Sequence, residues 1–389
     1  MKLNHGLHLA YCTNIHRGET WAETFASLEQ YTLAVRAQVC PDRPYAIGLR
    51  LSERAARELS QPPTLRGFKN WLARHDCYVF TINGFPYGQF HATRVKEQVY
   101  RPDWTSPDRL AYTNLLFDLL SEMLPPGVSG SVSTLPGSFK EFITSAEQEQ
   151  LIRDNLWRCV EHIVALSQRT GQDLHLGLEP EPLGYFENTV ETIRFFEQLR
   201  AEHPNDSRLN KHLGVNYDTC HLAVEFESAR DALTALQKSQ IKISKLHLSN
   251  ALKVIPLAEN RAHLAAFADD TYLHQVSVRT TDGRRMMFKD LPPALQTSAA
   301  YDLTPPPEWR IHFHIPLQTP ATDWYDSTAD HVLEVFDLLK ENPHLCSHLE
   351  METYTWEVMP TDLKNRSVVD QLTAEYAWTL RHLAERGLA

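Results

Sequence analysis

Acidic, imidazole and amide side chains occur at the ends of four strand-like segments between residues 174 and 354. Segment by segment, these residues are Glu179 and Glu181, Asp218 and His221, His247 and Asn250, and Glu350 and Glu352. Carboxylates and imidazoles are the ligands with which proteins hold Zn²⁺, Mn²⁺ or a similar divalent ion. Without a cation, carboxylates gathered in one place would repel each other and lose hydration. The pattern therefore predicts a divalent-metal site.

Each of these residues also has a structural interpretation. Glu179 and Glu181 lie two apart and face the same side of a strand, so one of them can be a ligand and the other an ion-pair partner. The structural alternative for Asp218 is that it caps the N-terminus of the following helix and binds no metal. His247 alternates with two leucines and points inward, where a hydrogen-bonded core histidine is the alternative. The metal-site prediction therefore rests on the four segments together.

Further histidines and aromatic residues extend the predicted site. His221 follows Asp218 by three residues and is predicted as a substrate contact or a second ligand. His312 and His314 share one face of a strand-like segment, where they are either ligands or a surface pair. An organic substrate would need a pocket wall, and aromatic residues near strand ends that can provide it are Phe85, Tyr87, Tyr185, Phe186, Tyr354 and Trp356.

The elements that must position these side chains are alternating strands and amphipathic helices. Strand patterns occur at 7–13, 45–52, 77–84, 130–137, 174–181, 213–219, 243–250, 310–317 and 347–354. Repeated strand–helix units predict a parallel sheet covered by helices, and eight units close a (β/α)₈ barrel whose catalytic groups lie at the C-terminal ends of its strands. An open doubly wound sheet is the alternative, but the usual glycine-rich nucleotide motifs are absent from the sequence.

The ninth strand pattern indicates an insertion. About 100 residues separate 250 from 347, whereas one strand–helix unit needs about 30. This excess contains a predicted hairpin around Asp282 and Gly283. We therefore expect one TIM-barrel domain over 1–389, with an insertion at about 251–310, segment 310–317 as an excursion of the same loop, and 347–354 as the eighth strand.

The composition limits the partners. The 389 residues include 42% hydrophobic and 22% charged residues, and the net charge of −11 argues against duplex DNA or an anionic membrane as a partner. No apolar window of about 18 residues predicts a membrane span, and no secretion signal is recognisable at the start. Six scattered cysteines without a C-x-x-C pair are typical of a reducing compartment. We expect a cytoplasmic protein that binds a small-molecule metabolite; the sequence does not determine its oligomeric state.

The order Glu, Asp-x-x-His, His, Glu along strands five to eight resembles the xylose-isomerase-like TIM barrels, which include sugar isomerases, sugar epimerases and AP endonucleases. Five strings are similar to one branch, the EboE-like metabolite traffic proteins of the ebo gene cluster, and the similarity covers nearly the whole chain. That cluster is associated with moving a secondary-metabolite precursor out of the cytoplasm. The strings are LGLEPEPLGYFENT, VNYDTCHLAVEFE, SKLHLSNAL, HFHIPL and HLEMETYTWEVMP.

The resemblance implies a role for each residue. It assigns Glu179, Asp218, His247 and Glu352 as ligands of a divalent metal, Zn or Mn, with Glu181 and Glu350 as the alternative glutamates. In the epimerases the two metal-bound glutamates exchange a proton with a carbon next to a carbonyl, which makes Glu179 and Glu352 the expected catalytic residues. The expected substrate contacts are His221, Glu181, Asn250 and His314.

Three functions follow as hypotheses. The first is a metal-dependent isomerase or epimerase acting on a sugar-like or polyhydroxy metabolite. The second is a phosphoesterase of the AP-endonuclease type, which histidines His312 and His314 would support and the net charge of −11 opposes. The third is a non-catalytic carrier of a metabolite. The Glu-Pro-Glu pair and the long insertion depart from the epimerase pattern, so the ligand set and the substrate remain open.

Overall fold

Eight parallel strands form a nearly closed barrel in the computed structural model, which describes residues 1–297, 304–361 and 363–389. The strands follow each other around the sheet in the order β1-β13-β7-β6-β5-β4-β3-β2, and a parallel bridge between Cys12 and Gly48 joins the last strand to the first. The strands are β1 (His8–Tyr11), β2 (Tyr45–Arg50), β3 (Cys77–Asn83), β4 (Gly130–Thr134), β5 (Leu174–Leu178), β6 (Leu213–Asp218), β7 (Lys242–Leu248) and β13 (His348–Met351). The predicted TIM barrel is confirmed.

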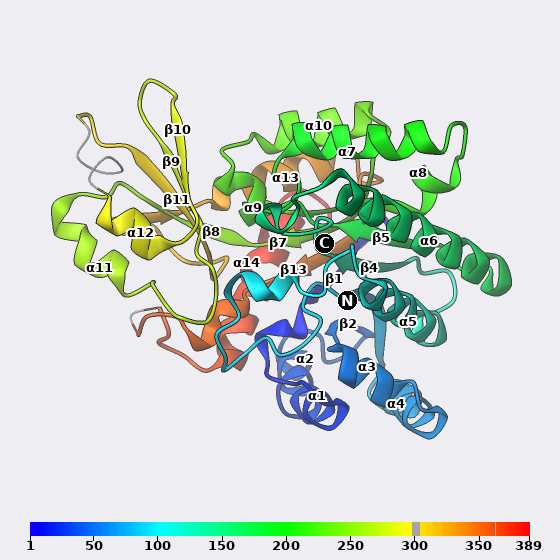
Figure 1. The fold of residues 1–389 in the computed structure, drawn as a ribbon. Coiled ribbons are helices and arrows are strands. Elements are labelled where there is room, and N and C mark those ends of the chain that lie inside the picture. The colour runs from blue at the N-terminus through cyan, green and yellow to red at the C-terminus, as the bar shows by residue number, and fades with distance from the viewer. Residues whose placement is uncertain (298–303, 362) are drawn as a thin grey trace.

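Helices cover the outside of the barrel (Figure 1). The strands are buried along nearly their whole length, and the helices pack one apolar side against them. The longest helix, α6, begins at a capping box of Ser145 and Gln148 and ends at Gly171, where φ is 72°. The helices are α1 (Trp21–Ser27), α2 (Leu33–Val39), α3 (Glu53–Leu59), α4 (Pro62–Arg74), α5 (Pro107–Met123), α6 (Ala146–Thr170), α7 (Thr189–Glu202), α8 (Arg208–His212), α9 (Thr219–Val224), α10 (Ala229–Lys238), α13 (Ala329–Glu341) and α14 (Val368–Ala384).

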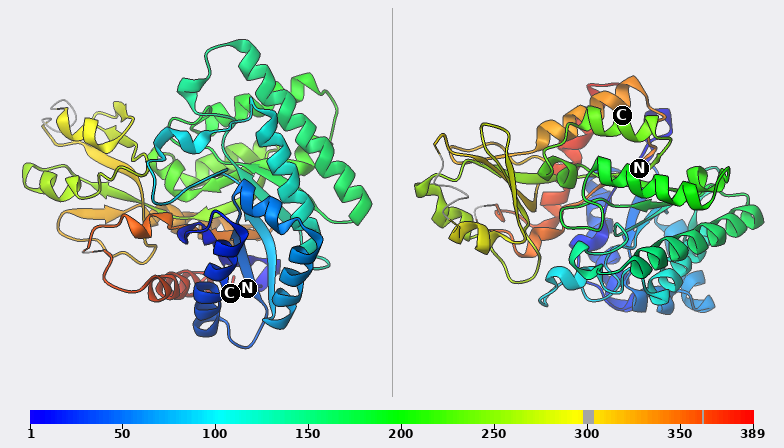
Figure 2. Two further views of the ribbon diagram at one scale, coloured as in Figure 1. Left: turned by 60° about the horizontal axis from the view of Figure 1, so that its bottom comes forward. Right: turned by 45° about the horizontal axis from the view of Figure 1, so that its top comes forward.

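The insertion after the seventh barrel strand forms a second, antiparallel sheet that stands beside the barrel (Figures 1 and 2). Its strand order is β10-β9-β11-β8-β12, and it has its own apolar core around Trp309, Ile311 and Phe313. The predicted hairpin at Asp282 and Gly283 lies between β9 and β10. The elements of the insertion are β8 (Asn250–Val254), α11 (Arg261–Ala265), β9 (Val276–Arg279), β10 (Arg285–Phe288), α12 (Leu291–Gln296), β11 (Glu308–Ile315) and β12 (Tyr325–Ser327).

The position of the insertion after strand seven is confirmed, and its elements extend over 250–327, beyond the expected 251–310. Residues 298–303 of the expected range lie outside the described part of the chain. That residues 1–389 form a single domain stays a prediction. In the described ranges, no helix is both long and apolar enough to cross a bilayer.

Gly48 permits a close approach inside the barrel. A Cβ atom at this position of β2 would lie 2.1 Å from Oε1 of Glu350 and 2.7 Å from the carbonyl oxygen of Tyr11. The backbone of β2 therefore packs so closely against the Glu350 side chain that no methyl group fits between them.

We predict that Gly48→Ala lowers the free energy of unfolding by about 1–3 kcal/mol or more, because it overpacks the barrel. Gly67→Ala is the matched control: Gly67 lies in α4, and its Cβ would meet nothing within 4 Å. This second change should stabilise the chain by about 0.5–1 kcal/mol through helix propensity. Urea unfolding of both variants checks the pair, and equal effects would contradict the steric account.

Candidate metal centre

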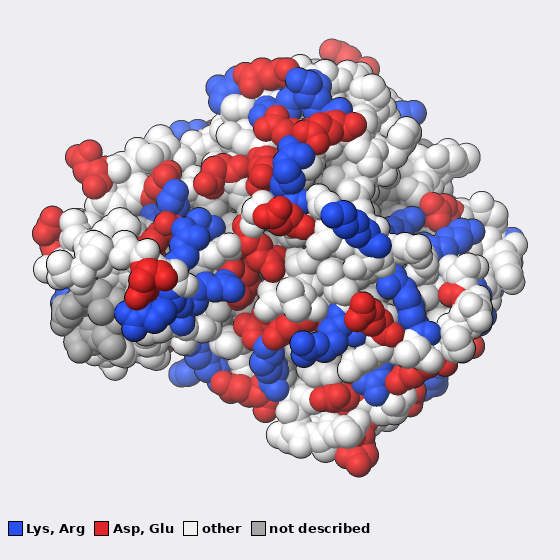
Figure 3. Space-filling view, turned by 90° about the horizontal axis from the view of Figure 1, so that it is seen from above, with Lys and Arg blue, Asp and Glu red and all other residues white. Residues whose placement is uncertain are grey.

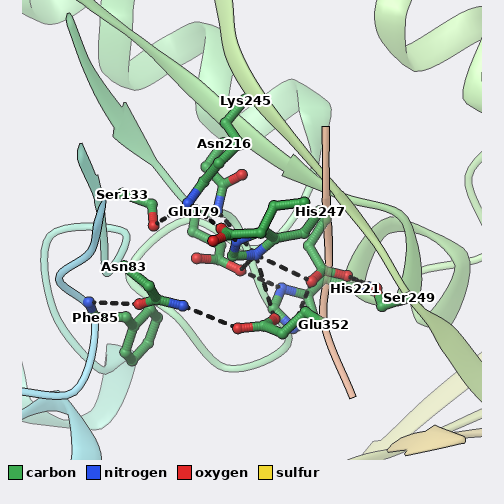
Figure 4. Close-up of polar contacts among 12 residues, drawn as sticks. Asn83, Phe85, Ser133, Glu179, Asn216, His221, Lys245, His247, Ser249 and Glu352 are labelled. Carbon is green, nitrogen blue, oxygen red and sulfur yellow. Dashed lines mark hydrogen bonds and ion pairs between the residues drawn. The ribbon is translucent and has the colours of Figure 1, made fainter. Parts of the chain in front are cut away.

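Four side chains from consecutive barrel strands converge at the C-terminal end of the barrel. Glu179 follows β5 directly, Asp218 ends β6, His247 lies on β7 beside Asp218, and Glu352 follows β13 directly. All four are at most 5% exposed. One ligand atom from each lies within 4.8 Å of those of the other three. Figure 4 shows Glu179, Glu352 and His221 around the ring of His247.

The geometry of this cluster fits a divalent cation. Nδ1 of His247 lies 2.9 Å from Oε1 of Glu179, 3.2 Å from Oε2 of Glu352 and 3.6 Å from Oδ2 of Asp218. Oε2 of Glu179 and Oδ2 of Asp218 are buried and have no hydrogen-bond partner. Buried carboxylate oxygens without a partner are costly unless they coordinate a metal. One imidazole with three carboxylates is a donor set that suits ions such as Mn²⁺ and Zn²⁺.

The charges of the cluster depend on each other. Burial alone would lower the pKa of His247, but Glu352 and Glu179 raise it well above its usual value. Burial likewise would raise the pKa of Asp218, while the positive charges of the nearby His221 and His247 hold it well below its usual value. The ring of His247 thus carries a positive charge among several carboxylates in the protein alone.

Asp218 serves two roles through its two oxygens. Oδ1 accepts hydrogen bonds from the backbone N of Cys220 at 2.7 Å, the backbone N of His221 at 3.1 Å and Oγ of Ser249 at 2.6 Å. This is the predicted N-cap, here of α9. Because the cap uses Oδ1, Oδ2 stays directed at the cluster, so the capping and ligand interpretations are compatible.

Two asparagines hold Glu352 in place. Nδ2 of Asn14 donates to Oε1 of Glu352 at 2.7 Å, and Nδ2 of Asn83 donates to the same oxygen at 3.0 Å. The sequence reasoning missed both residues. Asn83 ends the third strand, so reading the C-terminal ends of strands one to four with the same attention would have found it.

Glu350 lies on the opposite side of His247 from the cluster. Its Oε2 accepts from Nε2 of His247 at 2.8 Å and from Nζ of Lys245 at 2.5 Å, and Lys245 also donates to Oγ of Ser133 at 2.8 Å. Burial would raise the pKa of Glu350, but Lys245 and His247 hold it at about 2. Of the two candidate glutamates, Glu352 therefore faces the cluster, and Glu350 orients the imidazole.

Glu181 lies outside the four-residue cluster but close to it. It groups with His221 and His312, and its Oε1 has no hydrogen-bond partner. Burial raises the pKa of Glu181 to about 8. Glu179 is thus the glutamate of the pair that faces His247.

Three histidines form a second group against the first. The ring of His221 lies 4.5 Å from that of His312 and 5.6 Å from that of His314, centroid to centroid. His312 and His314 come from β11 of the insertion, and their Nε2 atoms are buried without a hydrogen-bond partner. Burial lowers the pKa of both, which leaves the neutral imidazoles that metals bind. Asp218, His221 and His314 also bring ligand atoms within 4.8 Å of one another.

A cavity opens onto both groups. Of the predicted substrate contacts, His221 and Glu181 line it, whereas His314 and Asn250 are not among its lining residues. Nδ2 of Asn250 instead donates to the carbonyl oxygen of Leu317 at 3.2 Å. Of the predicted aromatic wall, Phe85 and Tyr354 line the cavity. The lining residues also include Asn14, Asn83, Phe90, Val95, Lys96, Val99, Tyr100, Glu179, Tyr272, Leu273, Gln275, His312 and Glu352.

Comparison with solved structures identifies the fold. An L-ribulose 3-epimerase is 12% identical, with 99% of this chain and 96% of that chain covered and a TM-score of 0.51. The IOLI protein with a bound zinc atom is 12% identical, with 98% and 99% covered and a TM-score of 0.52. A xylose isomerase-like TIM barrel protein from Mycobacterium smegmatis in complex with magnesium is 11% identical, with 98% and 97% covered and a TM-score of 0.50. The fold is that of a xylose-isomerase-like TIM barrel.

These likenesses extend over nearly the whole chain, and at such identities they concern the fold. No protein-family model and no curated protein sequence matches the chain. The four-residue cluster lies at the C-terminal ends of the barrel strands.

We predict that Lys245→Met destabilises the barrel by about 3–5 kcal/mol, because Lys245 and Glu350 are fully buried and the change leaves the carboxylate without its cation. Lys253→Met is the control, because Lys253 pairs with Asp326 at a partly exposed site and should contribute less than about 1 kcal/mol. Urea unfolding measures both. Adding Glu350→Gln to Lys245→Met should recover part of the loss; a further loss would contradict the ion-pair account.

Proposed function

We propose that this protein is a divalent-metal-dependent isomerase or epimerase acting on a small metabolite that carries a hydroxyl next to a carbonyl. The observation that carries the proposal is the position of Glu179 and Glu352, which belong to the buried four-residue cluster and also line the cavity. Two carboxylates that share a substrate cavity can serve as a paired acid and base.

The proposed ligands of the cation are Glu179, Asp218, His247 and Glu352, and Zn²⁺ or Mn²⁺ is the proposed ion. The unpartnered oxygens of Glu179 and Asp218 support this assignment. Two solved structures of the same fold, one with a zinc atom and one with magnesium, are consistent with it. When bound, such an ion acts as a Lewis acid that polarises a carbonyl group.

The protein's own groups divide the remaining work. Asn14 and Asn83 donate to Oε1 of Glu352, so its other oxygen, Oε2, is the one left to hold or release a proton. Glu179 follows β5, a strand separated from β13 by β6 and β7, and its ligand atom lies within 4.8 Å of that of Glu352. Nδ1 of His221 donates to the carbonyl oxygen of Pro180 at 3.2 Å, which fixes its ring beside the cavity for substrate contact. Removal of a proton by one glutamate and return by the other would invert the carbon between them.

We predict that Glu179→Gln and Glu352→Gln each lower turnover by about 10² to 10⁴, the usual contribution of a positioned acid or base. Metal affinity should fall only in part, because glutamine keeps an oxygen ligand. Glu122→Gln, at an exposed glutamate paired with Lys69, is the control and should change neither quantity. The measurement is deuterium incorporation from D₂O into keto and aldo sugars with Mn²⁺ or Zn²⁺ present. Incorporation that persists undiminished in both glutamine variants would refute the two-glutamate mechanism.

A finer assignment within this proposal is the EboE-like metabolite traffic branch, which the five sequence strings support. In that setting the same cavity can also serve a carrier that binds a metabolite without converting it. A carrier predicts that the two glutamine variants change ligand affinity alone, and that the wild-type chain incorporates no deuterium. Deuterium incorporation by the wild-type chain would therefore exclude a pure carrier.

A metal-dependent phosphoesterase is the second candidate function, and the three-histidine group of His221, His312 and His314 favours it, since a further ion could bind there. A nucleic-acid substrate is opposed by the net charge of −11. On the face shown in Figure 3, acidic and basic side chains are interspersed rather than gathered into a basic stripe.

Metal content separates the two candidates. The isomerase assignment predicts about one tightly bound ion per chain, and the double variant His312→Ala/His314→Ala should keep it, because neither histidine belongs to the four-residue cluster. The phosphoesterase assignment predicts more than one ion, with the excess lost in the double variant. Elemental analysis of the purified wild-type chain and the variant decides between them.

A further inference from the structure

The polar and apolar parts of the cavity lining come from different elements. Glu179, Glu181, His221 and Glu352 follow the ends of barrel strands. The apolar and aromatic lining comes mainly from the segment after β3 and from the insertion. It consists of Phe85, Pro86, Phe90, Val95, Val99, Tyr100, Tyr272 and Leu273, together with Tyr354.

Three aromatic rings form the centre of this wall. Phe90 lies 5.1 Å from Tyr272 and 5.3 Å from Tyr354, and Tyr272 lies 5.0 Å from Tyr354, measured between ring centroids. Tyr354 is only two residues beyond Glu352, so the wall begins next to the candidate metal centre. Ring centroids at these separations are typical of edge-to-face and tilted packing, which another ring can extend.

Two polar side chains of this part of the lining, Lys96 and Gln275, are already paired with the protein, whereas the buried hydroxyl of Tyr100 has no hydrogen-bond partner. Nζ of Lys96 donates to the carbonyl oxygen of Asp269 at 2.9 Å and to Oδ2 of Asp290 at 2.7 Å. Nε2 of Gln275 donates to the carbonyl oxygen of Pro182 at 2.9 Å, and its Oε1 accepts from His312 at 2.8 Å. A chain of sugar hydroxyls lying here would exchange water for a surface that offers few free partners, which costs free energy.

The wall is fixed in place by bonds between the segment after β3 and the insertion. The backbone N atoms of Val95 and Lys96 donate to the carbonyl oxygen of Thr271 at 2.9 and 2.8 Å. The hydroxyl of Tyr272 donates to Nδ1 of His91 at 2.7 Å, and Nε2 of His91 donates to the carbonyl oxygen of Asn14 at 2.6 Å. The apolar wall is therefore present before any ligand binds, so its chemistry selects the ligand.

We propose that the substrate carries an apolar, ring-containing body attached to its hydroxy-carbonyl head, and that the insertion selects it through Tyr272 and Leu273. The proposal rests on the proposed function for the head, which lies at Glu179 and Glu352, and adds the body. The cavity has a volume of about 70 Å³ for the centres of bound atoms, which is space for one small organic group.

The test compares two ketones with the same head. Dihydroxyacetone carries a second hydroxymethyl group where α-hydroxyacetophenone carries a phenyl ring. Calorimetric titration of the Mn²⁺-loaded full chain should show α-hydroxyacetophenone binding roughly 10- to 100-fold more tightly, because burying an aromatic ring contributes a factor of that order.

Variants of the wall locate the preference. Leu273→Asn keeps the branching at Cγ and the number of heavy atoms but places an amide in the wall, and should reduce the ring preference about tenfold or more while the affinity for Mn²⁺ stays unchanged. The isosteric Val99→Thr should act in the same direction. Leu257→Asn is the matched control, since Leu257 is 40% exposed on the same insertion, and it should behave as wild type. Thermal unfolding confirms that each variant is folded.

Each outcome bears on one proposal or the other. Equal or tighter binding of dihydroxyacetone would overturn the ring-bearing substrate, and so would failure of both ketones to bind. Mn²⁺ binding without a ring preference would leave the proposed function standing and remove this inference. A ring preference that persists without any Mn²⁺ binding, and is lost in Leu273→Asn, would support the apolar wall and remove the metal-dependent function.

Discussion

The imidazole of His247 is the contact on which the centre of this barrel depends. Its Nδ1 faces the carboxylates of Glu179, Asp218 and Glu352, while its Nε2 bonds to Glu350. A buried ring between acidic groups is stable only if the negative charge is balanced locally. Lys245 supplies that balance on the inner side, and the outer side presents oxygens that fit a cation. On the Nε2 side of the ring, Lys245 thus balances the charge of Glu350. On the Nδ1 side, the carboxylate oxygens are left to bind a cation.

The insertion adds side chains beside the candidate metal centre. It places His312 and His314 against His221 and closes the cavity with Tyr272 and Leu273. The barrel supplies charges at fixed strand ends, and the added sheet supplies shape and apolar surface above them. The cavity is therefore lined by residues of both the barrel and the insertion, whose sheets have separate apolar cores.

The barrel and its cluster were predictable because both follow local periodic rules. Strand patterns alternate with amphipathic helices, and Glu179, Asp218, His247 and Glu352 each stand where a strand pattern ends. Their partners follow no such rule, because Asn14 and Asn83 reach Glu352 from the opposite end of the chain.

Other features depend on contacts between residues far apart in the sequence, which a local sequence pattern does not show. Lys245 shares a strand face with His247, so the period of two placed it inside the barrel, but a buried lysine becomes plausible only once Glu350 is seen beside it. The insertion reaches Ser327 rather than residue 310 because β8 pairs with both β11 and β12. The end of the insertion is therefore set by the pairing register of strands that lie far apart in the sequence.

The bonds that hold the cavity wall also order the events of folding. Lys96 meets Asp269 and Asp290 across 173 and 194 residues of sequence, and His91 meets Tyr272 across 181. Contacts at such separations form only after long loops have closed, which makes them late in folding. During synthesis the segment after β3 leaves the ribosome well before its partner exists, so its apolar side chains stay uncovered until the insertion arrives. The same residues that shape the cavity in the finished protein are therefore exposed surface in the growing chain.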